Sequence, residues 1–90
     1  MSRITRYLRE RRLRRMKAKR EAWISASNES RRDSMEYAIK AYHMDQFATP
    51  MAWGRMQNAA NWSKHMERVY REKADELYRE IQALELDLVQ

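Results

Sequence analysis

Cysteine is absent from the 90-residue chain, and glycine and proline occur once each. Without cysteine the chain has neither a disulfide nor a cysteine-ligated metal to hold a small fold together. Turns between strands draw heavily on glycine and proline, so this chain is poorly suited to forming a sheet. Good helix formers, such as Ala, Leu, Met, Glu, Lys and Arg, are abundant instead. The composition therefore predicts an all-α protein.

Long apolar runs are also missing. No stretch approaches the ~18 apolar residues that cross a bilayer, and no apolar core follows the basic residues at the N-terminus, as it would in a secretory signal. We therefore expect no membrane partner. A cytoplasmic location is expected, since the lack of cysteine fits a reducing compartment. An arginine-rich mitochondrial presequence is the alternative for the first residues.

Residues that could carry catalysis are scarce. The chain has two histidines, His43 and His65, but no HExxH motif, glycine-rich phosphate loop or nucleophile elbow. His65 and Glu67 lie two residues apart, as do His43 and Asp45, and side chains at that spacing do not face each other on a helix. We therefore expect a protein that is not an enzyme, with no catalytic residue, metal, cofactor or small-molecule substrate.

Two domains are predicted, a basic arm over residues 1–24 and a helical hairpin over residues 30–88. A polar stretch, Ser25 to Ser30, separates them. Ser30 and Asp33 resemble a capping box, which predicts that the hairpin's first helix covers about 31–47. Four apolar residues at i, i+3, i+4 and i+7 spacing predict its buried face. These are Met35, Ala38, Ile39 and Tyr42.

The hairpin's second helix is predicted over about 50–88. Thr49 followed by Pro50 is typical of a helix start, with threonine as the N-cap and proline at the first helical position. An apolar stripe of mean period 3.6 continues from there, which predicts a straight helix with one apolar side. The stripe consists of Ala52, Met56, Ala59, Ser63, Met66, Tyr70, Ala74, Leu77, Ile81, Leu84 and Leu88.

The predicted helices differ in length, so the shorter one covers only about residues 51–69 of the longer. The uncovered apolar strip predicts a homodimer or an obligate complex, unless the basic helix covers it. Five of its residues are candidates for a protein interface, together with two tryptophans that flank the stripe on opposite sides. The candidates are Trp53, Trp62, Tyr70, Leu77, Ile81, Leu84 and Leu88.

The charge is concentrated in the first 24 residues, which hold ten bases against Glu10 and Glu21, whereas residues 25–90 hold nine bases against eleven acids. Eight of those ten bases are arginines, which favour bidentate contacts with phosphate. The basic segment, from Arg3 to Arg20, is therefore the candidate nucleic-acid-binding site. Its bases are Arg3, Arg6, Arg9, Arg11, Arg12, Arg14, Arg15, Lys17, Lys19 and Arg20.

Three hypotheses explain this segment. It binds a polyanion; it lies along the acidic residues 67–90, where its charges pair within the chain or between subunits; or it contacts a protein. Trp23, at its end, packs in a core or stacks on a base or an arginine. The leading prediction is a small nucleic-acid-binding protein, a regulator of DNA or RNA. The alternatives are a protein-binding inhibitor or adaptor of the kind that phages encode, which docks on a larger machine, and a structural component of a larger particle.

Overall fold

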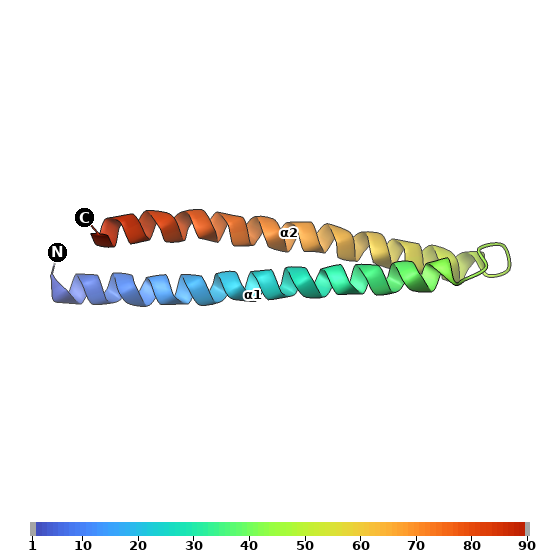
Figure 1. The fold of residues 1–90 in the computed structure, drawn as a ribbon, viewed down its shortest axis with the longest axis horizontal. Coiled ribbons are helices and arrows are strands. Elements are labelled where there is room, and N and C mark those ends of the chain that lie inside the picture. Colours follow the sequence, from blue (N-terminus) through green and yellow to red (C-terminus); the bar gives the residue numbers. More distant parts are fainter. Residues whose placement is uncertain (1, 90) are drawn as a thin grey trace.

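The computed structural model describes residues 2–89, which form a hairpin of two long helices (Figure 1). Helix α1 spans Arg3–Tyr42 and helix α2 spans Pro50–Val89, and each is 40 residues long. The helices run antiparallel, side by side, in a rod of 70 × 15 × 14 Å. We call the end that carries both termini the open end, and the end that carries the loop the tip. The predicted all-α helical hairpin is confirmed.

Local hydrogen bonds define where the helices begin. The Ser2 hydroxyl accepts from the Thr5 amide at 3.1 Å and caps α1. At the tip, the Asp45 carboxylate accepts from the Phe47 amide at 2.9 Å and from the Ala48 amide at 3.2 Å. Helix α2 begins at Pro50, as the Thr–Pro pair predicts. The Thr49 hydroxyl, however, donates to the Asp45 carbonyl oxygen at 2.8 Å, so it holds the turn.

Helix α1 passes without a break through residues 25–30, where the sequence predicts a linker. Ser30 and Asp33 lie inside it, so the expected capping box does not exist, and the helix ends at Tyr42, short of the predicted end at 47. The stretch contains no glycine or proline. Serine and asparagine lower helix propensity by only a fraction of a kcal/mol per residue, which packing against a second helix offsets. The predicted arm and the first hairpin helix are therefore one helix.

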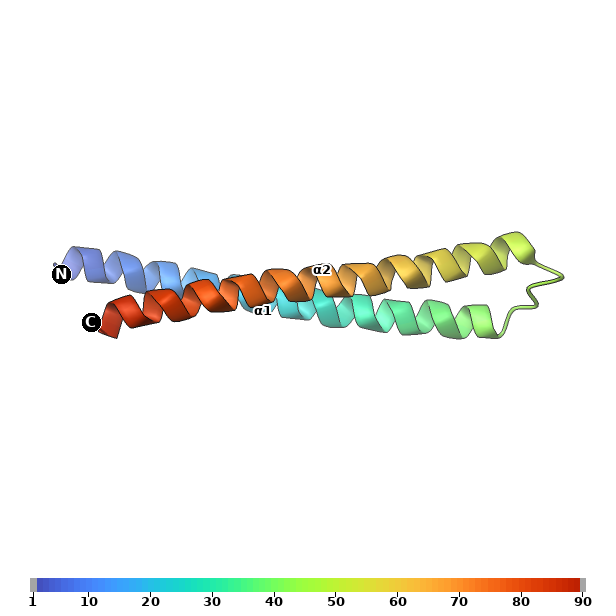
Figure 2. The ribbon, with the colours of Figure 1, turned by 90° about the horizontal axis from the view of Figure 1, so that it is seen from above.

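The helices pack along a seam whose residues are alternately three and four positions apart. On α1 the seam contains Leu13, Met16, Arg20, Trp23, Ser27, Ser30, Ser34, Tyr37 and Ala41. On α2 it contains Trp53, Met56, Ala60, Ser63, Glu67, Tyr70, Ala74, Leu77, Ile81, Leu84 and Leu88. This is the 3.5-residue period of a coiled coil, which keeps two helices in contact as they wind around each other. Figure 2 shows the two helices crossing.

The predicted stripe on α2 is therefore wrong at three positions of its first half, Ala52, Ala59 and Met66, whereas Met56 and Ser63 lie in the seam as predicted. Ala60 is buried, whereas the predicted Ala59 is only half-buried. The prediction took α2 to be a straight helix, of which a shorter helix covers only about residues 51–69. Because α1 accompanies α2 along the rod, the buried positions follow the seam between the two helices instead.

Small side chains fill the middle of the seam. Ser27 has no exposed surface, and its hydroxyl donates to the Glu67 carbonyl oxygen on α2 at 3.2 Å. Ala60 and Ser63 are the buried residues of α2 in this region. Such small side chains let the two backbones approach closely enough for a side chain to bond the opposite main chain. Larger residues return towards the open end, where Ile81 is buried.

Candidate nucleic-acid interface

The basic segment forms the first half of α1 and lies beside the last part of α2 (Figure 1). Its bases differ in burial, because two of them, Arg9 and Arg20, are half-buried. The other eight are exposed to solvent. They are Arg3, Arg6, Arg11, Arg12, Arg14, Arg15, Lys17 and Lys19.

Arg20 lies in the seam. Its guanidinium carbon is 5.0 Å from the ring centroid of Tyr78 on α2, a cation–π arrangement. Its Nε is buried without a hydrogen-bond partner, and its Nη1 lies 4.0 Å from a Glu21 carboxylate oxygen. Arg20 thus contributes to the contact between the helices, which separates it from the exposed bases of the segment.

The part of α2 beside the basic segment is acidic, since residues 72–89 hold six acids against two bases. Yet only one ion pair of the described residues joins the helices, Lys17 Nζ to Glu85 Oε1 at 2.8 Å. Arg6 pairs with Glu10 inside α1 at 3.2 Å. Six exposed bases of the segment have no ion-pair partner in the described chain. They are Arg3, Arg11, Arg12, Arg14, Arg15 and Lys19.

The hypothesis that the basic helix lies along the acidic end of the chain therefore describes the arrangement of the helices. It does not account for the charges, because one interhelical pair leaves most of the basic segment facing solvent. Figure 1 also shows that the start of α1 extends beyond the end of α2. Ile4, Tyr7 and Leu8 are exposed there. The first turns of α1 can consequently be approached from several sides.

Six of the seven residues expected at a protein interface lie in the seam instead, five of them in the second half of α2. Tyr70 stacks on Trp23 with ring centroids 5.5 Å apart, and Ile81 is buried. Leu77, Leu84 and Leu88 are half-buried on the same side of α2. The strip that they form is covered by α1 of the same chain. A dimer was expected only if the basic helix left this strip uncovered. The expectation of a dimer loses that particular support.

The tryptophans lie in different surroundings. Trp53 is half-buried on the seam, whereas Trp62 is 64% exposed, with its ring 5.8 Å from that of His65. Trp53 thus lies within the seam and not beside it, whereas Trp62 lies outside it. Trp23 packs in the seam, with Lys73 Nζ 5.2 Å from its ring centroid. Trp62 is thus the tryptophan that remains accessible to a partner.

Near the tip, the face of α1 that was predicted to be buried is its outer face. Met35, Ile39 and Tyr42 are exposed, while Ser34 and Tyr37 occupy the seam. Both sets have helical spacing, and hydrophobicity alone favours the wrong one. A heptad extended from Leu13 and Met16 through Trp23 would have reached Ser27, Ser30, Ser34 and Ala41. Because serines are typical of a polar linker, the heptad spacing of these positions was not recognised from the sequence.

The two histidines do not form a site with other groups. His43 lies edge-on to Tyr42 with ring centroids 5.4 Å apart, and both histidines are exposed. Among the described residues, no three His, Cys, Asp or Glu side chains are placed to hold a metal ion. Over this same part of the chain, neither helix has a stretch that is apolar enough and long enough to span a bilayer.

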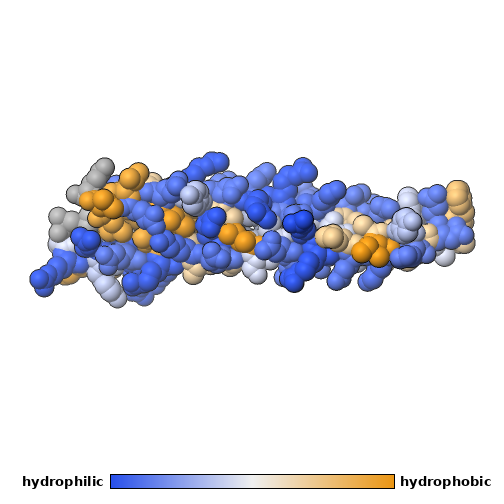
Figure 3. Space-filling model, viewed as in Figure 1, coloured by the Kyte–Doolittle hydropathy of each residue, from blue (hydrophilic) through white to orange (hydrophobic). Residues whose placement is uncertain are grey.

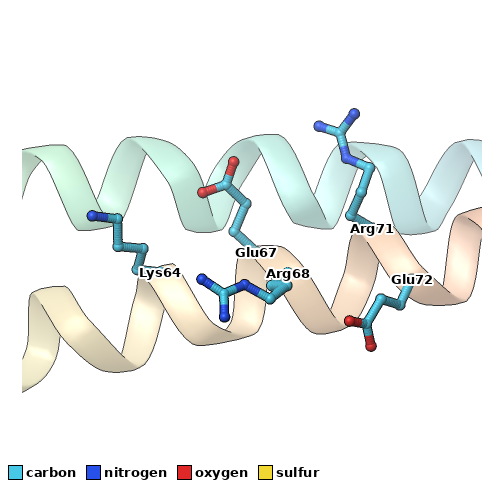
Figure 4. Close-up of a pocket in the computed structure, with 5 residues that line it drawn as sticks. All are labelled: Lys64, Glu67, Arg68, Arg71 and Glu72. Atoms are coloured by element: carbon cyan, nitrogen blue, oxygen red, sulfur yellow. The ribbon is translucent and has the colours of Figure 1, made fainter.

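A shallow hollow on α2 is lined by charges of both signs (Figure 4). Arg71 extends towards α1, where its Nε lies 3.4 Å from the Ser27 hydroxyl oxygen, and Glu72 points away. Lys64, Glu67 and Arg68 complete the lining. The mixed charges give neither an anion site nor a cation site.

Comparison with known proteins gives no relative. No protein-family model matches the chain, and neither a curated protein nor a solved structure matches it.

Proposed function

We propose that the protein binds nucleic acid through the phosphates that its basic segment contacts. The observation that carries this proposal is the accumulation of eight exposed bases on one half of one helix, six of them without an ion-pair partner in the described chain. Charges this dense repel one another, and a polyanion relieves that repulsion. Phosphate contacts also release counterions, which supplies much of the free energy of such binding.

The kind of base supports phosphate as the ligand. Five of the six exposed bases without an ion-pair partner are arginines, whose planar guanidinium forms two parallel hydrogen bonds to phosphate oxygens. The neighbouring acids set the direction of approach. Because α2 is acidic beside the basic segment, a nucleic acid is expected to approach from the side of α1 that faces away from α2. In this proposal the protein acts by binding and catalyses no reaction.

Salt-dependent binding tests the proposal. Anisotropy titrations of a labelled DNA duplex and an RNA hairpin between ~50 and ~200 mM salt measure the slope of log affinity against log salt. If about five phosphates are contacted on duplex DNA, that slope is near −4 or −5. Changing Arg11, Arg12, Arg14 and Arg15 to alanine should flatten it by about 0.9 for each phosphate that is no longer neutralised.

A matched control removes the same charge elsewhere. Arg31, Arg32, Arg55 and Arg68 are exposed and lie outside the basic segment, so their joint change to alanine gives the same net charge. The control variant should keep the wild-type slope, and circular dichroism should show both variants helical. No binding of DNA or RNA at ~50 mM salt overturns the proposal. Equal weakening in both variants would show that net charge alone attracts the polyanion, without the basic segment.

A second candidate function is protein binding, as an inhibitor or adaptor on a larger protein. The observation that favours it is Trp62, a large aromatic side chain that is 64% exposed in the first half of α2. Tryptophan is enriched among the residues that dominate binding energy at interfaces. If the basic segment binds no nucleic acid, its arginines and Trp62 become the contacts to test against a protein partner.

A further inference from the structure

Apolar side chains accumulate at the tip of the hairpin, far from the basic segment. Met35 is 57% exposed, Ile39 56%, Tyr42 85% and Phe47 86%. The first three lie on the outer face of α1 at i, i+4 and i+7, and Phe47 is in the loop that follows. We call these four residues the tip patch. Figure 3 shows apolar surface near the loop as well as at the open end, with a hydrophilic surface over most of the length between them.

The area of the tip patch is about two-thirds of what one partner buries in a standard interface. If each side chain offers about 200 Å² when fully exposed, the four expose roughly 550 Å². The largest apolar patch on a typical monomer is about 300–600 Å² and often functional. A standard interface buries about 800 Å² on each partner. The tip patch with its immediate surroundings is therefore large enough for the centre of one.

A shallow hollow adjoins the tip patch. It has a volume of about 460 Å³ and opens between the end of α1, the loop and the start of α2. Its apolar lining consists of Ala38, Ala41, Tyr42, Met44, Phe47 and Trp53. Tyr42 and Phe47 are thus both exposed at the tip and part of this shallow hollow, whose lining also includes Asp45, Gln46 and Gln57. In a two-fold interface both copies supply this surface, so that the aromatics of one pack against the hollow of the other.

Charge favours this end of the rod for self-association. Residues 35–54 hold only Glu36, Lys40 and Asp45 as charged groups besides His43, a net of −1. Two tips can therefore meet with little repulsion. The open end differs, because the basic segment and residues 72–89 beside it together hold twelve bases against seven acids, a net of +5. Two copies aligned in parallel would bring their basic segments together, within about a Debye length at 0.1 M salt.

We propose that the protein forms a two-fold homodimer through the tip patch, with the two basic segments at opposite ends. The two hairpins overlap only near their tips, over roughly 17 Å if the overlap runs from Met35 to the end of the loop. The dimer is consequently a long rod, whose greatest dimension exceeds about one and a half times the 70 Å of one hairpin. This proposal is independent of what the basic segment binds.

The test is the mass and length of the full chain in solution. Sedimentation equilibrium across a micromolar concentration range measures the dissociation constant, and small-angle scattering measures the greatest dimension. Ile39→Glu with Tyr42→Glu should weaken dimerisation at least a hundredfold, about tenfold for each buried apolar side chain that is replaced by a charge. Both side chains are on the outer face of α1, so circular dichroism should show the variant still helical.

The matched control is Leu86→Glu, because Leu86 is 62% exposed on α2 near the open end. It should dimerise like the wild type. A monomer at every concentration overturns the proposal, as does a dimer that survives the double change at the tip. Loss of the dimer in Leu86→Glu alone would place the contact at the open end and equally reject it. A dimer as short as one hairpin would show parallel or fully overlapped packing and reject the tip-to-tip arrangement.

Discussion

Ser27 has no exposed surface, although a serine contributes little apolar area to a core. Its hydroxyl donates to the Glu67 carbonyl oxygen at 3.2 Å and lies 3.4 Å from the Arg71 Nε. A carbonyl oxygen has two lone pairs, so it can accept from the serine in addition to its hydrogen bond within α2. The serine hydroxyl is therefore satisfied without disturbing α2. The value of the residue lies in its small volume. It lets the helices approach where a leucine would hold them apart.

Enlarging this residue should therefore destabilise the hairpin. Ser27→Leu adds methylenes to a packed contact and removes the hydrogen bond to α2, which should cost about 1–3 kcal/mol of the free energy of unfolding. Urea denaturation followed by circular dichroism measures it. Ser25→Leu is the control, since Ser25 is exposed on the same helix and its change should cost less than about 0.5 kcal/mol. Equal losses of unfolding free energy at the two positions would contradict the placement of Ser27 in the seam.

Two tryptophans give a second pair of matched positions. Trp23 stacks on Tyr70 in the seam, whereas Trp62 is 64% exposed. Trp23→Ala should lower the free energy of unfolding by about 3 kcal/mol, because it removes both buried apolar area and an aromatic pair. Trp62→Ala should leave the melting temperature nearly unchanged. If Trp62→Ala proves the more damaging of the two, the assignment of seam and surface is wrong.

At the scale of helices, the sequence predicts α2 well and α1 poorly. The start of α2 follows from Thr49 and Pro50, two residues whose local preferences do not depend on tertiary contacts. The extent of α1 depends on packing. Residues 25–30 have the composition of a linker, and only the long helix opposite makes small seam residues favourable there. The same dependence explains why apolar spacing places Ile39 in the core, although its side chain is exposed.

The candidate site divides in the same way. That the basic segment is a cluster of exposed charge could be predicted, because ten bases in 18 residues cannot all be buried or paired. That Arg20 would stack on Tyr78 could not, since it requires the register between two helices. The tip patch also could not be predicted from the sequence. Its recognition needed the seam to be known, because an outer face is defined only by the inner one.

A proline in the middle of α1 distinguishes a continuous helix from two helices with a linker. Glu29 is exposed within the stretch that the sequence predicts to be a linker. Glu29→Pro should cost about 3 kcal/mol or more of unfolding free energy, because it removes a helical hydrogen bond and clashes with the preceding turn. Glu29→Ala, at the same position, should be neutral or slightly stabilising. Denaturation of both variants measures the difference in unfolding free energy. If proline is tolerated as well as alanine, residues 25–30 are a linker and α1 is not continuous.

At the scale of the whole molecule, the hairpin places the basic segment and the tip patch at opposite ends of a rod 70 Å long. The open end carries exposed apolar side chains as well, among them Ile4 and Leu86, whereas the exposed bases of the basic segment lie at that end alone. A rod of two packed helices holds these surfaces apart more firmly than a flexible linker would. Taken together, the proposed phosphate contacts and the proposed dimer make the protein bivalent for nucleic acid, with its two binding ends facing away from each other.

Bivalency predicts that the wild-type protein links two nucleic-acid molecules. Beads that carry one DNA duplex, incubated with protein and a second, fluorescent duplex, should retain fluorescence at ~50 mM salt. The variant Ile39→Glu with Tyr42→Glu should bind the beads but retain little of the second duplex, because a monomer has one basic segment. Leu86→Glu should link as the wild type does. A large excess of protein should abolish linking, since every duplex is then occupied by its own dimer.

The outcomes of this experiment separate the two proposals on which the prediction rests. Protein that fails to bind the beads contradicts the nucleic-acid proposal and leaves the dimer to be judged by its mass alone. Equal linking by the wild type and the tip variant means that the bases of a single hairpin can reach two duplexes. In that case the charges around α1 contact phosphates on more than one side, and self-association at the tip has no part in linking. Linking that is abolished only in the tip variant requires both surfaces, each acting from its own end of the rod.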